Sequence, residues 1–145
     1  MTDVQTLILS LDAADGTDRR QAALALGAVR DDAVVGALLD RLRVEPDSRV
    51  REDLTWAVVQ HAEPAHPRLV AMLADDDPAQ RRTAAHVLSK VASADDFDAV
   101  APLVADADPD VAIKAYRAAA NTGGERAVGV LVVEAVQALG LSPSP

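Results

Sequence analysis

The sequence predicts an all-α fold, an α-α superhelix (α-solenoid) of about four helical hairpins with a capping helix at each end. The first observation is a recurring helix start, an aspartate often followed by proline, which suits the first helical position because it has no N–H to lose there. The second is an apolar stripe at helical spacing after each start. The leading aspartates are separated by 32, 30 and 31 residues, and they are Asp15, Asp47, Asp77 and Asp108. A period of this size is typical of stacked helical hairpins.

The amino-terminal segment is predicted to form a capping helix. Thr2 suits the N-cap position, and Gln5 reaches back to it from the third helical position. The apolar residues that follow have the i, i+3, i+4, i+7 spacing of an amphipathic helix, and they are Val4, Leu7, Ile8 and Leu11. The other face is polar, as the end of a repeat array requires where it meets water.

The first two hairpins are predicted from their start and stop signals. In the first, residues 15–44, the first helix covers 18–26, Gly27 ends it, and an aspartate at 31 or 32 caps the second helix. The second hairpin begins at residue 45, and its first helix runs to about Gln60. Prolines in residues 63–67 are expected to interrupt the helical pattern before it resumes at Leu69, because a residue that precedes proline avoids the α region.

The third and fourth hairpins begin at Asp77 and Asp108. The third has a short second helix from about 96 to 104, in which Pro102 is either tolerated near the start or kinks the helix. The fourth closes with an apolar helix from about 125 to 139. Residues 141–145 are predicted to be a frayed tail.

Length and composition predict one soluble domain over residues 1–145. Half of the residues are hydrophobic, which is enough for a continuous core. Cysteine is absent, the first residues lack the basic region of a secretory signal, and no apolar run approaches the ~20 residues of a membrane span, so a cytoplasmic protein is expected. The net charge of −9 argues against nucleic-acid binding, which needs clustered Lys and Arg. The acidic surface either solubilises the chain or attracts a basic partner.

The repeated pattern resembles a known family. After the leading Asp, the first helix reads Arg-x-x-Ala-Ala-x-x-Leu and a leucine-rich second helix follows, which is similar to the HEAT repeat in its short bacterial form over about residues 15–135. The resemblance implies an α-solenoid in which Asp and Arg side chains form a hydrogen-bonded ladder between successive turns. The residues that fit this ladder are Asp15, Asp47, Asp77, Asp108, Arg19, Arg51 and Arg81. The fourth copy has Ala112 at the arginine position, so the ladder should weaken there.

Enzymes of similar fold are the alternative. The nearest approach to a metal constellation is His61, Glu63 and His66, with His86 one repeat further on, but these residues lack the i, i+4 spacing that projects two ligands together. The HEAT-type di-iron hydroxylases rely on contiguous His-Glu pairs, which this sequence lacks. HEAT-like DNA glycosylases have a basic, aromatic cleft, whereas this acidic chain has one Trp, one Tyr and one Phe. No signature of the phycobilin lyases is found. The sequence therefore predicts no enzyme activity, no cofactor and no metal.

Two faces of the hairpins are candidate binding surfaces for another protein or a peptide. Leu24, Trp56, His86 and Arg117 occupy equivalent places about 200 degrees around the first helix from the buried stripe, so this column should face outward. Trp and Arg are common interface anchors. The alternative is that Trp56 folds over the neighbouring hairpin as part of the core. The second-helix face, which is concave in the family, offers Arg41, Arg68 and Met72, and it suits a helix or an extended peptide.

The last helix is predicted to make an intermolecular contact. A helical wheel places Val128, Leu131, Val132, Ala135, Ala138 and Leu139 on the inward face. This leaves Val130, Val133 and Val136 on the opposite side, where a terminal repeat should be polar. Self-association about a two-fold axis would cover them. A partner's helix or the chain's own tail could cover the same valines instead, and so small a patch could also simply stay exposed to water.

Overall fold

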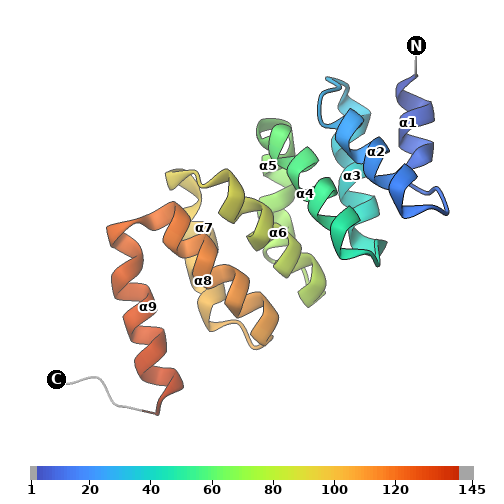
Figure 1. Cartoon of the computed structure of the whole chain (residues 1–145). Coiled ribbons are helices and arrows are strands. Elements are labelled where there is room, and N and C mark those ends of the chain that lie inside the picture. The colour runs from blue at the N-terminus through green and yellow to red at the C-terminus, as the bar shows by residue number, and fades with distance from the viewer. Residues whose placement is uncertain (1–2, 141–145) are drawn as a thin grey trace. The chain divides into compact units, whose positions relative to one another are not determined.

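The computed structural model describes residues 3–140, and within them the chain forms nine α-helices and two 3₁₀-helices (η) with no β-strand. In chain order these are α1 (Val4–Ser10), α2 (Gly16–Leu26), α3 (Asp32–Val44), α4 (Ser48–Gln60), α5 (Ala62–Met72), α6 (Pro78–Val91), η1 (Ala94–Asp96), α7 (Phe97–Val100), η2 (Ala101–Ala105), α8 (Pro109–Gly123) and α9 (Glu125–Ala138). Short turns join the helices (Figure 1). The predicted all-α class is confirmed, and its helices follow the predicted hairpin order.

The chain divides into two compact units, unit 1 ending at Pro67 and unit 2 beginning at Arg68, so the boundary lies within α5. In unit 1, α2 packs against α1 and α4, and α3 packs against α4. In unit 2, α8 packs against α6, α7, η2 and α9. The single-domain organisation expected from the chain length stays a prediction.

The apolar stripes that follow the leading aspartates form much of the core in each unit. Unit 1 is rich in fully buried aliphatic side chains, among them Leu26, Val34, Leu38, Leu39, Leu42, Val50, Leu54 and Val58. One cluster in unit 2 combines Phe97 and Val104 with the small residues Ala115, Ala119 and Ala127. A Cβ added at Gly123 would lie 2.4 Å from Cδ2 of Phe97, so the end of α8 approaches this ring too closely for any side chain.

Two helical segments differ from the sequence-based prediction. The expected interruption at residues 63–67 is wrong, because α5 runs from Ala62 to Met72 through both prolines. Pro64 lies in the first turn, where a backbone N–H has no helical partner to lose, whereas Pro67 gives up one internal hydrogen bond. The second helix of the third hairpin, expected as one piece, is divided into η1, α7 and η2, with Pro102 at the start of η2.

The predicted ends of the chain are only partly described. The N-cap of α1 is Asp3, whereas the predicted capping residue Thr2 and the predicted tail at residues 141–145 lie outside the described residues. No helix within residues 3–140 combines the length and the apolar character that a membrane crossing needs.

Candidate functional site

The four leading aspartates are the N-caps of α2, α4, α6 and α8. In each case a side-chain Oδ1 accepts a hydrogen bond from the backbone N–H two residues later, at 2.7 Å for Asp15, 2.8 Å for Asp47, 3.0 Å for Asp77 and 2.9 Å for Asp108. An aspartate in this place satisfies one of the four orphan N–H groups of a helix start. The leading aspartates therefore fix where each first helix begins.

The predicted ladder arginines bond to a different carboxylate. Arg19 donates from Nε to Oε1 of Glu45 at 2.7 Å and from Nη2 to Oε2 at 3.0 Å, while its Nη1 donates to the carbonyls of Ala13 and Ala14. Arg41 donates to the same Oε1 at 3.1 Å, and the N–H of Asp47 donates to Oε2 at 3.0 Å. Arg19 thus ties its own turn to the acid that lies two residues before the next leading aspartate. We call this arrangement a clasp.

Unit 2 repeats the clasp with its own residues. Arg81 donates from Nε to Oδ2 of Asp106 at 2.9 Å and from Nη2 to Oδ1 at 3.1 Å, and its Nη1 reaches the carbonyls of Asp75 and Asp76. The N–H of Asp108 donates to Oδ1 of Asp106 at 2.9 Å. The ladder predicted from the leading aspartates is therefore corrected: they cap helices, and the preceding acid accepts the arginine.

The third ladder arginine, Arg51, has the same local role. Its Nη1 donates to the carbonyl of Leu42, in the last turn of α3, at 2.7 Å and to that of Glu45, directly after α3, at 3.3 Å. In the fourth copy the position is Ala112, so α8 lacks the side chain that the other first helices use to hold this turn.

The clasp geometry shifts the titration of its acids. Burial raises the pKa of Glu45, but the hydrogen bonds from Arg19, from the backbone of Asp47 and from Arg41 outweigh it, so that the pKa lies below its ordinary value. The hydrogen bond from Arg81 is the largest influence on Asp106 and lowers its pKa. Both acids are held in the charged form that accepts the arginine.

The first-helix column is described separately in each unit. In unit 1, Leu24 is 61% exposed and Trp56 is 46% exposed, and they lie at equivalent positions on the packed helices α2 and α4. An ion pair between Arg20 Nε and Asp53 Oδ2, 2.6 Å apart, joins the same two helices. In unit 2 the equivalent residues are the half-buried His86 and the exposed Arg117. We call the pair Leu24 and Trp56 of unit 1 the first-helix face; Trp56 is too exposed to belong to the buried core.

The three residues predicted on the second-helix face differ in exposure and in their bonding partners. Arg68 is exposed, whereas Met72 is only 6% exposed and belongs to the core, so its prediction as a binding residue is wrong. Arg41 bonds to Glu45 and, through Nη1, to Asp12 Oδ1 at 3.1 Å, which places its guanidinium in the clasp of unit 1.

The two histidines of unit 1 differ in their surroundings. His61 is 3% exposed; its Nε2 lies 2.9 Å from the carbonyl of Leu26 and its Nδ1 lies 3.2 Å from Nη1 of Arg30. Because a carbonyl only accepts and a guanidinium only donates, the ring donates through Nε2 and accepts through Nδ1. His66 is exposed, as is Glu63. Within residues 3–140, no group of three or more His, Cys, Asp or Glu residues could hold a metal ion.

The face on which the last helix packs matches the predicted one only in part, since Leu131 was expected on it and Val130 was not. Ala127 is buried, and Val130 and Leu131 pack against the unit 2 core, whereas Val128, Val132 and Val133 are 54–61% exposed and Leu139 is 73% exposed. Of the predicted outward valines, Val130 therefore contacts the core, Val136 is half-buried and Val133 is exposed. Ala127 sets this orientation because a small residue lets α9 approach its neighbours closely directly after the Gly123–Gly124 turn.

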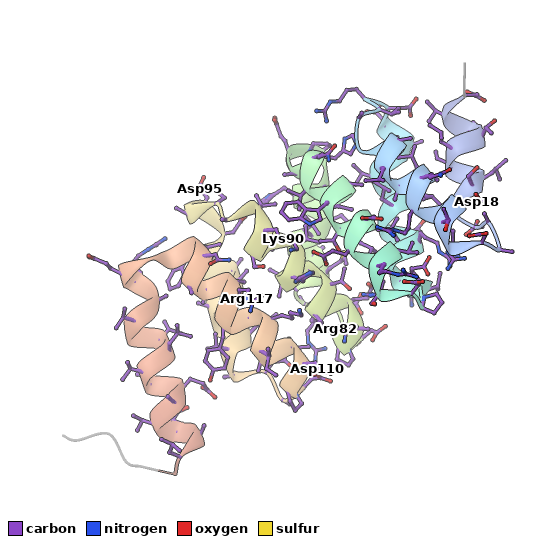
Figure 2. The ribbon with its side chains drawn as sticks, viewed as in Figure 1. Asp18, Arg82, Lys90, Asp95, Asp110 and Arg117 are labelled. Carbon is purple, nitrogen blue, oxygen red and sulfur yellow. The ribbon has the colours of Figure 1, made fainter. Side chains whose placement is uncertain are left out.

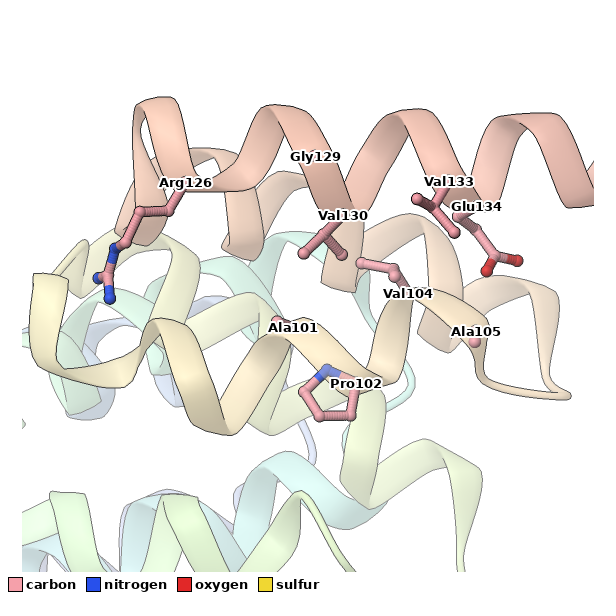
Figure 3. Close-up of a pocket in the computed structure, with 9 residues that line it drawn as sticks. All are labelled: Ala101, Pro102, Val104, Ala105, Arg126, Gly129, Val130, Val133 and Glu134. Atoms are coloured by element: carbon pink, nitrogen blue, oxygen red, sulfur yellow. The ribbon is translucent and has the colours of Figure 1, made fainter. Parts of the chain in front are cut away.

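An apolar groove of about 590 Å³ lies between η2 and α9. Val104, Val130 and Val133 line it, Arg126 lies at one end and Glu134 at the other (Figure 3). Arg126 also donates to the carbonyl of Ala94 at 3.0 Å and lies 4.6 Å from the centre of the Phe97 ring. Sequence reasoning missed this groove because it depends on the 3₁₀ geometry of η2.

Comparisons with known proteins agree with the fold. The profile of HEAT repeats matches residues 66–138, half of the chain. The CpcE–CpcF complex of phycocyanin lyase from Nostoc sp. PCC7120 is similar in structure, with a TM-score of 0.56 and 22% identity over 91% of this chain and 57% of that one. An engineered protein has a TM-score of 0.50 and 22% identity over 93% of this chain and 70% of its own. No curated protein matches the sequence.

Proposed function

The chain belongs to the HEAT repeat family, and on that premise we propose that it is a non-catalytic module that binds another protein through the first-helix face. Repeated helical hairpins present a series of equivalent side chains, which suits recognition of a partner rather than enclosure of a substrate. The alternative is a small enzyme or metalloprotein of the same fold.

Exposure of the only tryptophan carries this proposal. Trp56 leaves 46% of its surface in water although it lies in the middle of a well-packed helix, and Leu24 on the neighbouring helix is 61% exposed. Folding gains little from these two exposed surfaces, whereas a partner that covered them would gain apolar burial at a tryptophan, the residue type most enriched among interface anchors.

The test is Trp56→Ala against Val44→Ala, a control on α3 whose side chain is 63% exposed. Proteins captured from the native organism by the wild-type chain are compared with those captured by each variant, and the affinity of the main partner is measured. We expect Trp56→Ala to weaken binding by about 2 kcal/mol or more, with little change in Tm. A loss of stability of ~3–5 kcal/mol would instead make Trp56 a packing residue, and equal capture by both variants would remove the proposed site.

The single tryptophan also reports binding directly. Its emission maximum in the free protein should lie to the red of a buried indole, and it should move to the blue when a partner covers the ring. A partner that binds without moving this emission binds elsewhere.

The enzyme alternative has a separate test. A phycocyanin lyase shares the fold, but a shared fold is a weak basis for shared chemistry. Both ring nitrogens of His61 already have partners within the protein, Leu26 and Arg30, which a metal would have to displace. Stoichiometric iron or zinc in purified protein, lost on substitution of His61, Glu63 or His66, would overturn the non-catalytic proposal.

At the last helix we propose that the partner is a second copy of the chain. Arg126 and Glu134 are eight residues apart, about 12 Å along α9, at opposite ends of one groove. An antiparallel copy related by a two-fold axis would place Arg126 against Glu134 of the second copy, and the reverse, while the valines between them are covered. The groove is therefore complementary to itself in charge.

Light scattering at several concentrations tests the self-association. Val133→Glu should give a monomer, and Arg126→Glu or Glu134→Arg alone should weaken association, whereas the double reversal should restore it because opposite charges meet again across the axis. A wild-type chain that stays monomeric at high concentration contradicts the proposal, and in that case the tail or a partner's helix remains to be tested at this groove.

A further inference from the structure

One position on the first helices of the hairpins changes character in the last copy. It faces the first helix of the next hairpin: in unit 1 the residue is Arg20 of α2, whose Nε lies 2.6 Å from Oδ2 of Asp53 on α4. In unit 2 it is Arg82 of α6 (Figure 2), which lines a small pocket with Asp110 in the first turn of α8. The three earlier copies have a charged residue at this position, whereas the last has Ile113, which is 62% exposed.

The same side of α8 continues with Tyr116 and Ala120. Their equivalents on α6, Ala85 and Ser89, are 0% and 3% exposed, and α6 packs against α8. The hydrogen bond from Nδ2 of Asn121 on α8 to the carbonyl of Ser89, 3.0 Å long, shows that α8 lies over this side of α6. On α8 itself Tyr116 is half-buried and Ala120 is exposed. The last first helix thus leaves to water a side that the preceding one buries.

The last helix, α9, can be aligned with α3, the second helix of the first hairpin. Ala127 and Val34 are each the third residue of their helix, and both are buried. In this register Arg41, which lines a pocket between α1 and α3, corresponds to Glu134, which lines the groove between η2 and α9. The two helices therefore turn the same side toward the helix that precedes them in the stack of second helices.

The side of α9 that lies away from the groove is apolar and exposed. On α3 this side has Leu39 and Leu42, both 1% exposed, and in unit 1 it is closed by the next hairpin, whose first helix α4 packs against both α2 and α3. The equivalents on α9 are Val132, which is 55% exposed, and the exposed Ala135. Val128, one turn before Val132, is 61% exposed.

These two sides of α8 and α9 form one surface. The two helices pack against each other and run antiparallel through the turn at Gly124, so residues equally far from the turn lie side by side, as Ala120 does with Val128 (Figure 1). No helix follows α9 within residues 3–140. None of the six residues of this surface is charged. We call it the end face, and it consists of Ile113, Tyr116, Ala120, Val128, Val132 and Ala135.

We propose that the end face binds one amphipathic helix of a partner protein, seated as α4 is seated on α2 and α3. The buried side of α4 includes Val50 and Leu54, and Asp53 lies beside them opposite Arg20. An acid opposite Ile113 would lose its water without gaining a partner, so the bound helix should have an apolar residue there instead. Its apolar residues therefore have the spacing i, i+3, i+4, i+7, where i+3 is the place of Asp53 in α4.

The test uses two fluorescent helical peptides, about four turns long, with leucine at i, i+4 and i+7 and glutamate, lysine and alanine elsewhere. They differ only at i+3, which is leucine in one peptide and aspartate in the other. Wild type should bind the leucine peptide about tenfold more tightly, because the aspartate would be buried against Ile113. In Ile113→Arg, which has the side chain of Arg20 at this position, the ratio of the two affinities should shift about tenfold toward the aspartate peptide.

A second variant tests the part of the end face on α9. Val132→Glu places a carboxylate in the middle of the surface and should weaken binding of the leucine peptide about tenfold. Val133→Glu, at the next residue but in the groove, and Val44→Glu, on α3, are matched controls at valines that are 54% and 63% exposed, and they should stay within about twofold. Melting curves show whether each variant is folded, and Ile113→Arg, at an exposed position, keeps the test valid if Val132→Glu is not.

Three results would contradict the inference: no binding of the leucine peptide, equal binding of the two peptides by wild type, or the same loss in Val133→Glu as in Val132→Glu. A second copy is the other occupant to test. If wild type and Val133→Glu are dimers by light scattering and Val132→Glu is a monomer, a second copy covers the end face and the partner helix is wrong. The inference goes beyond the proposed function, because Trp56→Ala should leave binding of the peptide unchanged.

Discussion

The two clasps use the same backbone positions but differ in how deeply the acid is buried. The Glu45 side chain is fully buried and accepts hydrogen bonds from Arg19 and Arg41, whereas the Asp106 side chain keeps 11% of its surface exposed and accepts from Arg81. The shortest N–O distances are similar, 2.7 and 2.9 Å. The contribution of each clasp to stability should therefore depend less on the N–O distance than on two other properties. These are the number of donors that would lose their acceptor if the acid were removed, and how deeply the acid is buried.

The largest effect is expected for Glu45→Ala. This change leaves the guanidinium of Arg19, part of that of Arg41 and the N–H of Asp47 without their acceptor, so the free energy of unfolding should fall by about 2 to 3 kcal/mol. Urea unfolding followed by circular dichroism measures it. Glu63→Ala, which removes an exposed acid, is the control and should change the free energy by less than about 0.5 kcal/mol. Equal losses in the two variants would contradict the clasp.

Acid should weaken the clasps in a defined pH range. The folded pKa values of Glu45 and Asp106 lie below their ordinary values, so the stability that they contribute is complete above about pH 5 and is lost as the pH falls from the unfolded pKa through the folded pKa. Tm measured from pH 6 to pH 3 should fall for wild type and fall less steeply for Glu45→Gln, which has no charge to lose there. Parallel curves for the two proteins would mean that other acids dominate.

A smaller effect is expected for Asp106→Ala, which should lower the free energy of unfolding by about 1 kcal/mol. Water can reach Arg81 after its acceptor is removed and can replace part of the lost interaction. Asp98→Ala, at an exposed acid on α7, is the matched control. If Asp106→Ala proved as costly as Glu45→Ala, burial would not be what distinguishes the two clasps.

The smallest effect is expected for Ala112→Arg, which restores the arginine position in the fourth copy. The new guanidinium could hold its own turn, but the copy is not followed by another turn with an acid within residues 3–140. The free energy of unfolding should change by less than about 0.5 kcal/mol. A clear gain in stability would show that the carbonyls of the turn matter more than the acid.

The helix starts were predictable because an aspartate cap and a following apolar stripe are local signals. The clasp acids were not predicted, since the partner of an arginine depends on which turn lies within reach of its side chain in the folded state. A signal for them exists: an acid lies two residues before the leading aspartate in three of the four copies, at Glu45, Asp75 and Asp106.

The orientation of α9 and the burial of Met72 could not be predicted for related reasons. Aliphatic residues lie on several sides of α9, so a helical wheel has no unique apolar face, and the small Ala127 determines the packing instead. Met72 is near the end of α5, a helix that the prolines made difficult to place from sequence. The exposure of Trp56 was left open by the sequence because a tryptophan at an outward position can still fold onto its neighbours.

Each clasp acid also holds a loop amide. The N–H of Asp47 lies 3.0 Å from Oε2 of Glu45, and the N–H of Asp108 lies 2.9 Å from Oδ1 of Asp106. These amides belong to turns, where exchange with deuterium is ordinarily fast, yet they can exchange only when the acid moves away. Their exchange rates would therefore report on the opening of each turn individually, and the amide of Asp108 should exchange sooner than that of Asp47.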